Sequence, residues 1–181
     1  APYAMAHLNL EYVFRETGAT ALGESRYGIY LTNTLEDTHF DGNLFSPIDQ
    51  EAQAVSQLKQ GMRVMVMLGN PPYNVSSSNK SQWIEELMLT YKADLNEKNI
   101  KPLSDDYIKF IRFAQYQIEE RTQEGIVAFI TNNRFLDGVV HRQIRKELLR
   151  VFDAIYIVNL HGNSRTKEKT PEGGKDENVF D

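Results

Sequence analysis

Six consecutive residues, from Leu68 to Tyr73, combine groups that could hold a small planar molecule. The side-chain oxygen of Asn70 accepts hydrogen bonds, and so does the carbonyl of Pro71, which no neighbouring strand has claimed. Tyr73 adds a flat aromatic face beside these two acceptors. This combination suits a planar substrate that carries an amino group, because both N–H bonds can be held while the ring is stacked.

Holding an aromatic amine in this way would also activate it. The amine is a poor nucleophile because its lone pair is delocalised into the ring. Accepting both hydrogens favours a pyramidal nitrogen and frees the lone pair to attack an electrophilic carbon, without a titrating base. A simpler interpretation remains open, in which Pro71 and Pro72 only end a strand and Tyr73 packs at the surface.

The segment that must position these residues is Arg63–Gly69. It is dominated by apolar residues, a pattern typical of a strand that is covered on both faces. Pro71 and Pro72 end this strand because neither can donate to a β-ladder. The candidate residues therefore lie at the carboxyl end of a buried strand, where open α/β sheets bind their ligands.

Strands and helices are predicted to alternate along the rest of the chain. Further strands are predicted at residues 27–31, 126–130 and 154–158, and helices at 3–16, 48–60, 104–118 and 138–150. Ser104 is predicted to cap the third helix, with Asp105 and Asp106 in its first turn. Short buried strands joined by helices indicate an α/β fold with a mostly parallel sheet and flanking helices.

The composition is that of one globular domain. The chain has 181 residues, 41% of them hydrophobic, and it has no cysteine, which excludes a disulfide framework and a cysteine nucleophile. Lys and Arg number 20 against 25 Asp and Glu, so any contact with nucleic acid must be local. No apolar run approaches the roughly 20 residues that span a bilayer, so we expect a cytoplasmic protein without a membrane partner.

The histidines and the C-terminal region add less. The four histidines, His7, His39, His141 and His161, show no paired metal-ligand spacing, so no metal site is predicted. Residues 161–178 contain no aliphatic or aromatic side chain and are predicted to form a long polar loop. A loop of this length inside a compact domain is usually functional or disordered.

The turn from Asn70 to Tyr73 resembles motif IV of the amino-methyltransferases that use S-adenosylmethionine and modify the N6 position of adenine in DNA. Residues 106–118 and 125–132 resemble the segments that follow this motif in the same enzymes. Residues 159–164 and 176–181 are similar to large single-chain restriction–modification enzymes, in which helicase or nuclease parts share the polypeptide with the methyltransferase. The similarity covers nearly the whole chain.

The resemblance implies a Rossmann-like fold of S-adenosylmethionine-dependent methyltransferases, of which residues 1–181 would form a single partial domain, the catalytic half. Asn70 and the Pro71 carbonyl, in a catalytic turn completed by Pro72, would hold the amine of an adenine flipped out of double-stranded DNA. Tyr73 would stack on this base, and Phe180 would be a weaker second aromatic contact.

For the cofactor, the resemblance implies a contact between its adenosine and the turn of Asn33, Thr34 and Leu35. Asn33 stands where many relatives have an acidic residue. The glycine-rich loop that cradles the methionine part, and the acidic strand end that grips the ribose, precede the position of Ala1 in the family. We therefore expect the chain to be a fragment with one edge of the S-adenosylmethionine site, and to show no turnover by itself.

The function implied is site-specific adenine N6 methylation of DNA, with helicase or nuclease and target-recognition domains of the same polypeptide as partners. A protein-glutamine or RNA-base N-methyltransferase could use the same four residues, although such domains are compact and the long polar loop argues against them. In a third, non-enzymatic interpretation, the chain is a scaffold segment between motor and DNA-recognition domains, and its motif is unused.

Overall fold

The computed structural model describes residues 2–18, 27–36, 47–163 and 167–177. Two short strands, β1 (Val66–Gly69) and β2 (Ile126–Phe129), pair in parallel, with Val66 opposite Ile126 and Gly69 opposite Phe129. The connection between them is helical, as parallel pairing requires. Within the described residues, the chain is therefore a mixed α/β structure with a two-stranded parallel sheet.

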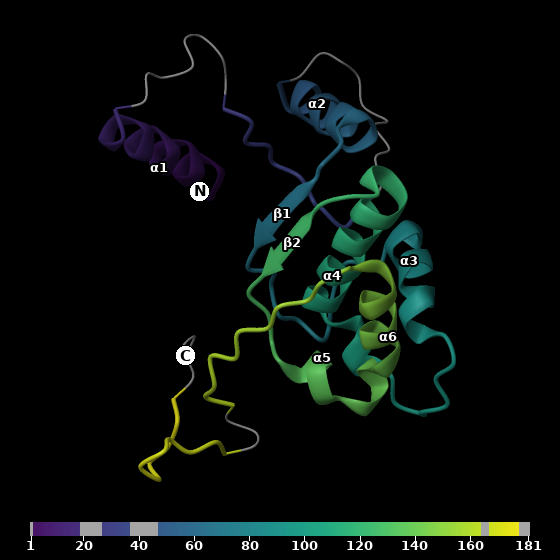
Figure 1. Ribbon diagram of the computed structural model, residues 1–181. Helices are drawn as coiled ribbons and strands as arrows, with labels where there is room; N and C mark the ends of the chain where they lie inside the picture. The colour runs from purple at the N-terminus through teal and green to yellow at the C-terminus, as the bar shows by residue number, and fades with distance from the viewer. Residues whose placement is uncertain (1, 19–26, 37–46, 164–166, 178–181) are drawn as a thin grey trace.

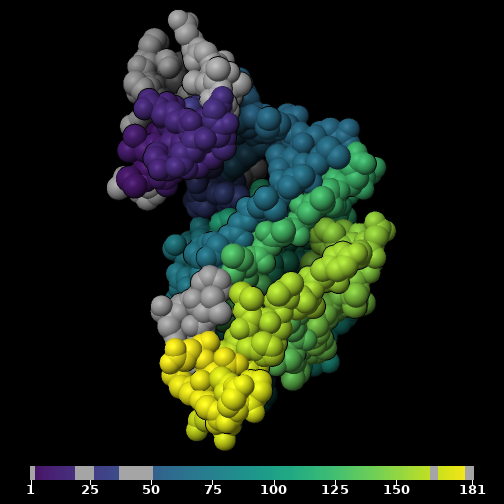
Figure 2. Space-filling model, turned by 60° about the vertical axis from the view of Figure 1, so that its left-hand side comes forward, coloured from purple at the N-terminus to yellow at the C-terminus, as the bar shows by residue number. Residues whose placement is uncertain are grey.

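Helices make up much of the described chain (Figure 1). The α-helices are α1 (Pro2–Glu16), α2 (Pro47–Gly61), α3 (Gln82–Lys92), α4 (Asp106–Tyr116), α5 (Arg134–Asp137) and α6 (Arg142–Val151). Shorter helical turns are η1 (Lys101–Ser104), the π-helical η2 (Gln117–Thr122) and η3 (Val139–His141). Helices α3, α4 and α6 lie together on one side of the strands, whereas α1 and residues 167–177 lie at opposite ends of the described structure (Figures 1 and 2).

Helix α4 is the centre of the core. Eight of its 11 residues are buried, so it packs on several faces. The core cluster joins it to α3, α6 and η1 through Met88, Tyr91, Leu103, Tyr107, Ile108, Ile111 and Ile144. Two of its buried polar side chains are paired with α3: Lys109 forms an ion pair with Glu85, and Gln115 accepts a hydrogen bond from Tyr91. This pairing allows polar groups to be buried at small cost.

The beginning of β2 requires a glycine. A Cβ atom on Gly125 would lie 2.4 Å from the carbonyl oxygen of Met65 and 2.3 Å from Cδ1 of Ile118. The next residue, Ile126, donates its N–H to this same carbonyl at 2.7 Å. A side chain at position 125 would therefore force the two strands apart.

The prediction of strands at 63–69 and 126–130 is confirmed, but neither strand is covered on both faces. Leu68 is 72% exposed and Ile126 is 61% exposed, whereas Met67 and Phe129, on the alternate face, are half-buried. The burial prediction is wrong for the described residues, because their helices cover only one face of the sheet. The parallel pairing and the helices at 3–16 and 48–60 agree with the sequence.

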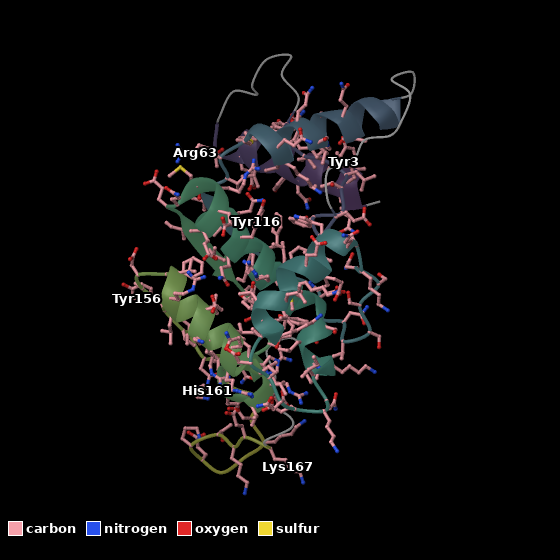
Figure 3. The ribbon with its side chains drawn as sticks, turned by 90° about the vertical axis from the view of Figure 1, so that its right-hand side faces the viewer. Tyr3, Arg63, Tyr116, Tyr156, His161 and Lys167 are labelled. Carbon is pink, nitrogen blue, oxygen red and sulfur yellow. The ribbon has the colours of Figure 1, made fainter. Side chains whose placement is uncertain are left out.

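The strands predicted at 27–31 and 154–158 are wrong. In the first segment, the N–H of Ile29 donates to the carbonyl of Tyr27 and the N–H of Leu31 donates to the carboxylate of Glu51, so these donors do not join a ladder. The second segment has no neighbouring strand in the described part of the chain, and Tyr156, 92% exposed, projects away from the helices (Figure 3). A strand-like sequence without an adjacent edge gives no sheet.

Two helix predictions need correction at their ends. Ser104 ends η1 and does not cap α4, whose N-cap is Asp105. The helix predicted at 138–150 begins later: Gly138 has an extended backbone after α5, the next three residues form η3, and the α-helix α6 begins only at Arg142. Among the described residues, no helix has both the length and the hydropathy needed to cross a membrane.

Candidate functional site

The turn from Asn70 to Tyr73 leaves β1 at its carboxyl end, as the sequence predicts. The carbonyl of Gly69 accepts the N–H of Ile130 at 3.0 Å, so the ladder continues to the last residue before the turn. Asn70 is exposed, Pro71 is buried, and Tyr73 is 47% exposed. The amide of Asn70 and the ring of Tyr73 are therefore both accessible to a ligand.

Internal contacts fix the ring of Tyr73. Its Oη lies 3.3 Å from Oδ1 of Asn70 and 3.2 Å from the carbonyl oxygen of Ile130, and its ring packs on Tyr107 with centroids 5.8 Å apart. Burial, and to a smaller extent the carboxylate of Asp105, raises the pKa of Tyr73, so the phenol keeps its hydrogen at neutral pH. One hydrogen serves only one acceptor fully, so the two lone pairs of the Asn70 oxygen are not both occupied.

The residue after the turn is held at both of its backbone groups. The N–H of Asn74 donates to Oδ1 of Asp105 at 2.8 Å, and its carbonyl accepts the N–H of Asp106 at 3.2 Å. Asp105 is buried, and this burial raises the pKa of its carboxyl group. The candidate turn is thus anchored on the N-terminus of α4, a role that sequence reasoning missed because it placed both aspartates only beside the helix dipole.

The turn predicted to contact a cofactor is also held within the chain. Asn33 accepts the N–H of Leu35 through Oδ1 at 3.1 Å and donates through Nδ2 to Oδ1 of Asn79 at 2.9 Å. Its carbonyl accepts from Lys59 at 2.7 Å, and Leu35 is completely buried. Because these polar groups are already bonded, the turn offers a cofactor only an edge, with Thr34 half-buried beside it.

A second buried carboxylate connects this turn to α4. Oδ1 of Asp106 accepts hydrogen bonds from Oγ of Ser77 at 2.6 Å and from Nδ2 of Asn79 at 2.8 Å. Oδ1 of Asn79 in turn accepts a hydrogen bond from Nδ2 of Asn33. Adjacent residues at the beginning of one helix are therefore linked to the two turns that the sequence singles out. Asp105 bonds Asn74, the residue after Tyr73, and Asp106 is connected to Asn33 through Asn79.

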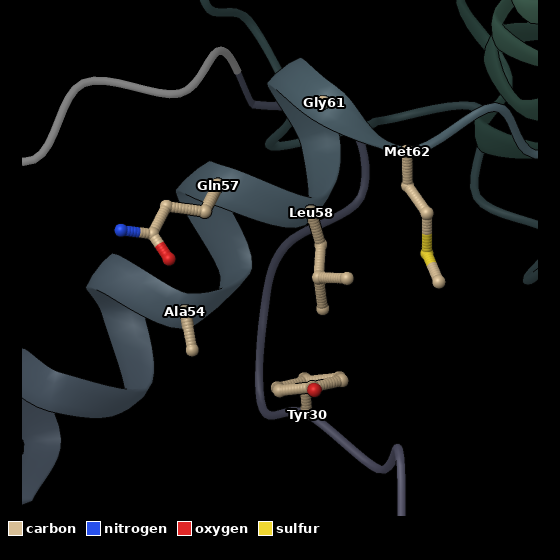
Figure 4. A pocket seen from close by; sticks show the side chains of 6 residues that line it. All are labelled: Tyr30, Ala54, Gln57, Leu58, Gly61 and Met62. Atoms are coloured by element: carbon tan, nitrogen blue, oxygen red, sulfur yellow. The ribbon is translucent and has the colours of Figure 1, made fainter.

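Two surface hollows lie near these turns. One has a volume of about 370 Å³, and Figure 4 shows the ring of Tyr30 facing the side chain of Leu58 in it. It is lined by Tyr30, Ala54, Gln57, Leu58, Gly61 and Met62. None of these side chains is charged, so the hollow could take an apolar group but has no charge to orient it.

The other hollow, of about 310 Å³, follows the candidate turn in sequence. It is lined by Val75, Ser76, Ser77, Lys80, Glu85, Lys101, Ser104 and Lys109. Lys109 is paired with Glu85, but Lys80 and Lys101 are exposed at the rim. The hollow therefore carries more positive than negative charge.

Two further residues from the sequence analysis are Phe180 and His161. Phe180 lies outside the described residues. One histidine, His161, comes close to Glu168 and Asp176, with one possible ligand atom from each within 4.8 Å of the others. The spacing of the histidines gives no signal for this group, which forms because the chain turns back at residues 169–175. Exposed carboxylates often gather without a metal, so we assign none here.

Comparison with solved structures gives related folds. A DrdV–DNA complex is 32% identical to this chain over 84% of its length, with a TM-score of 0.67. The ATP-dependent type ISP restriction-modification enzyme LlaBIII, bound to DNA, is 26% identical over 81%, with a TM-score of 0.63. A nuclease-deletion mutant of the type ISP enzyme LlaGI, in complex with a DNA substrate mimic, shares the fold at 24% identity over 95%, with a TM-score of 0.74.

The chain spans only a small part of these relatives, 15% of DrdV, 10% of LlaBIII and 15% of LlaGI. No curated protein matches the sequence. The family model of the Eco57I restriction-modification methylases matches residues 15–165, which include both candidate turns. Methylases of this kind generally use S-adenosylmethionine as the methyl donor. Because the family model matches most of the sequence, the chain belongs to the Eco57I restriction-modification methylase family.

Proposed function

We propose that this chain provides the adenine-binding part of a DNA adenine N6-methyltransferase in a restriction–modification enzyme of the cytoplasm. The observation that carries the proposal is the exposed amide of Asn70 beside the half-exposed ring of Tyr73, at the carboxyl end of a parallel strand. The strands with α3, α4 and α6 would be one partial domain, residues 1–181, of a Rossmann-like methyltransferase fold.

In this proposal, Oδ1 of Asn70 and the carbonyl of Pro71 accept the two hydrogens of the adenine amine, and Tyr73 stacks on the base. The phenol of Tyr73 already has a second acceptor, the carbonyl of Ile130 at 3.2 Å. When the amine binds Asn70, the phenol can give its hydrogen entirely to Ile130, so no polar group loses its partner. Phe180 would add a second aromatic contact.

The methyl donor supplies an electrophilic carbon when it is bound. The described residues fit this cofactor at one edge, near Thr34 in the Asn33–Leu35 turn, whose Asn33 side chain is already bonded within the chain. We therefore expect most of the S-adenosylmethionine site outside this chain, and no methyl transfer by residues 1–181 alone.

Two observations favour DNA as the substrate. The net charge is −5, so a polyanion needs local cations, and Lys80 and Lys101 supply them at the hollow directly after the turn. The DrdV and LlaBIII structures contain DNA. Helicase or nuclease and target-recognition domains would then be partners in the same polypeptide, as the resemblance to single-chain enzymes implies.

A substrate comparison tests the proposal. The full-length protein is incubated with labelled S-adenosylmethionine and, separately, with plasmid DNA, tRNA or a release-factor peptide. We expect label in DNA alone. Label in tRNA or the peptide would instead support the RNA-base or protein-glutamine methyltransferase, and label in none of the three would support a non-catalytic scaffold.

A further inference from the structure

The beginning of α4 connects to both candidate turns through two adjacent buried carboxylates. We propose that these carboxylates are positioning residues with separate tasks: Asp105 positions the Asn70–Tyr73 turn, and Asp106, through Asn79, positions the Asn33–Leu35 turn. The assignment of each turn to base or cofactor rests on the proposed function, whereas the mechanical separation of the two tasks does not.

The task of Asp105 follows from its bond to a backbone group. Its Oδ1 accepts the N–H of Asn74 at 2.8 Å, one residue after Tyr73. The carbonyl of Asn74 accepts from the backbone of Asp106 at 3.2 Å, a bond that no side-chain substitution removes. Losing the carboxylate at 105 would free one side of Asn74 and let the ring of Tyr73 move, while the other backbone bond remains.

The task of Asp106 follows from its bonds to side chains. Its Oδ1 accepts both Ser77 and Asn79, at 2.6 and 2.8 Å, and so fixes the amide of Asn79. That amide accepts the side chain of Asn33 at 2.9 Å. Removing the carboxylate at 106 would free Nδ2 of Asn79 and loosen the hold of this side chain on the Asn33–Leu35 turn, while the backbone of Asn79 keeps its bonds to Ser77 and Lys109. The bond between Asp105 and Asn74 stays intact.

Adjacent residues on a helix point in different directions, which explains why neighbours can hold different segments. The two side chains are a matched pair, because both are aspartates, both are buried, and both lie at the same helix end. Each is therefore the control for the other, since a general loss of stability would affect both turns alike.

The test uses the full-length protein with Asp105→Ala and Asp106→Ala. Amide hydrogen exchange measured by mass spectrometry reports the turns without any activity. We expect Asp105→Ala to speed exchange in residues 70–76 and not in 31–36, and Asp106→Ala to speed exchange in 31–36 and 77–80 and not in 70–73. Equal loosening of both turns by both variants, or no loosening, would overturn the proposal.

Binding and kinetics then connect each turn to its ligand. We expect Asp105→Ala to lower kcat/KM for plasmid DNA by about 10- to 100-fold, because a misplaced group is costly in an oriented site, and to leave the calorimetric Kd of S-adenosylhomocysteine unchanged. We expect Asp106→Ala to raise this Kd by about 10-fold, equivalent to about 1.4 kcal/mol. The reverse pattern, or equal effects of both variants on both ligands, would contradict the assignment.

Conservative variants separate hydrogen bonding from charge and from misfolding. Asp105→Asn keeps an oxygen that can accept from Asn74, so we expect it to restore most of the DNA activity. Asp105→Glu keeps the charge but displaces the acceptor by one methylene, so we expect it to behave like Asp105→Ala. Exchange separated as predicted, together with a wild-type protein that methylates no DNA, would refute the proposed function and leave the positioning intact.

Discussion

Similar apolar side chains are buried in the helical layer, which consists of α3, α4 and α6, but exposed on the outer face of the strands. Ile108 in α4 and Ile144 in α6 are fully buried in a shared core, whereas Leu68 in β1 and Val158 in the C-terminal segment are mostly exposed. The apolar faces of α3, α4 and α6 pack against one another, whereas the outer faces of β1 and β2 and the segment 154–158 have no such cover among the described residues. An apolar sequence pattern thus indicates that a surface is suited to burial, but it does not predict which segment will cover that surface.

The candidate site lies where these two regions meet. Asn70 continues from β1, whose outer face is exposed, while Asn74 is fixed to the beginning of α4. The rigidity of the turn therefore depends on the helical layer. Substitutions that weaken this layer should disturb the turn, and substitutions on the exposed face should not.

The largest predicted contrast is between two isoleucines. Ile108→Ala removes a fully buried side chain from the core and should lower the free energy of unfolding by about 2–5 kcal/mol. Ile157→Ala makes the same change in an exposed segment and should cost less than about 0.5 kcal/mol. Urea unfolding of the 181-residue chain measures both changes. Equal losses of unfolding free energy in the two variants would contradict the difference between the buried helical layer and the exposed segment.

The second effect is a pH dependence that originates in the helical layer. His141 is buried, its ring nitrogens have no partner among the described residues, and burial lowers its pKa from 6.5 to about 4. Between these two values the unfolded chain binds a proton that the folded chain does not. Stability is therefore complete above about pH 6.5 and should fall by up to about 3 kcal/mol as the pH falls toward 4.

Urea unfolding at several pH values between 7.5 and 4.5 measures this dependence. His141→Gln should flatten that part of the pH profile due to the imidazole, while Ile157→Ala should leave the profile unchanged. An unaltered slope in His141→Gln would show that other groups cause the pH dependence.

A smaller contrast uses two tyrosines. The buried phenol of Tyr91 donates to Oε1 of Gln115 at 2.6 Å, so Tyr91→Phe leaves a buried acceptor without its partner and should cost about 1–2 kcal/mol. Tyr156→Phe removes the same hydroxyl from an exposed ring and should change the free energy of unfolding by no more than about 0.5 kcal/mol. Thermal unfolding distinguishes them, and equal shifts in Tm would contradict the expected difference.

The smallest effect concerns the surface of the helical layer itself. Arg150 pairs with Glu119 and Glu147 but is half exposed, so Arg150→Ala should cost at most about 1 kcal/mol. The loss should shrink in 1 M salt, where charges are screened. Lys146→Ala, an exposed position on the same helix, is the matched control, and a salt-independent loss at 150 would point to packing of the arginine stem.

The sequence predicts the local elements better than their assembly. Helical periodicity identifies α1, α2, α4 and α6, and the apolar runs identify β1 and β2, because these signals depend on neighbours in the chain. The same apolar signal at 154–158 fails because a strand needs an adjacent edge, which no local pattern supplies. The predicted burial of both faces of β1 is wrong for a related reason, since helices of the described residues lie against only one of its faces.

In the candidate site, too, the sequence predicts the local features but not the contacts between distant segments. The placement of Asn70 and Tyr73 at a strand end follows from the prolines, which stop a ladder wherever they occur. The bonds from Asp105 to Asn74 and from Asp106 to Asn79 join residues about 30 positions apart, as the separations of 31 and 27 show. Two adjacent aspartates at a helix start give no sequence signal for such partners.

The most direct test of the central claim, that the Asn70–Tyr73 turn holds the amine of adenine, is the amount of N6-methyladenine in plasmid DNA. Nucleosides from DNA treated with the full-length protein are quantified by mass spectrometry for the wild type, Asn70→Ala and Tyr73→Ala. We predict N6-methyladenine with the wild type and a loss of at least about 100-fold in both variants, with an unchanged unfolding curve for Asn70→Ala, whose side chain is exposed. Wild-type levels of N6-methyladenine with Asn70→Ala would contradict the account.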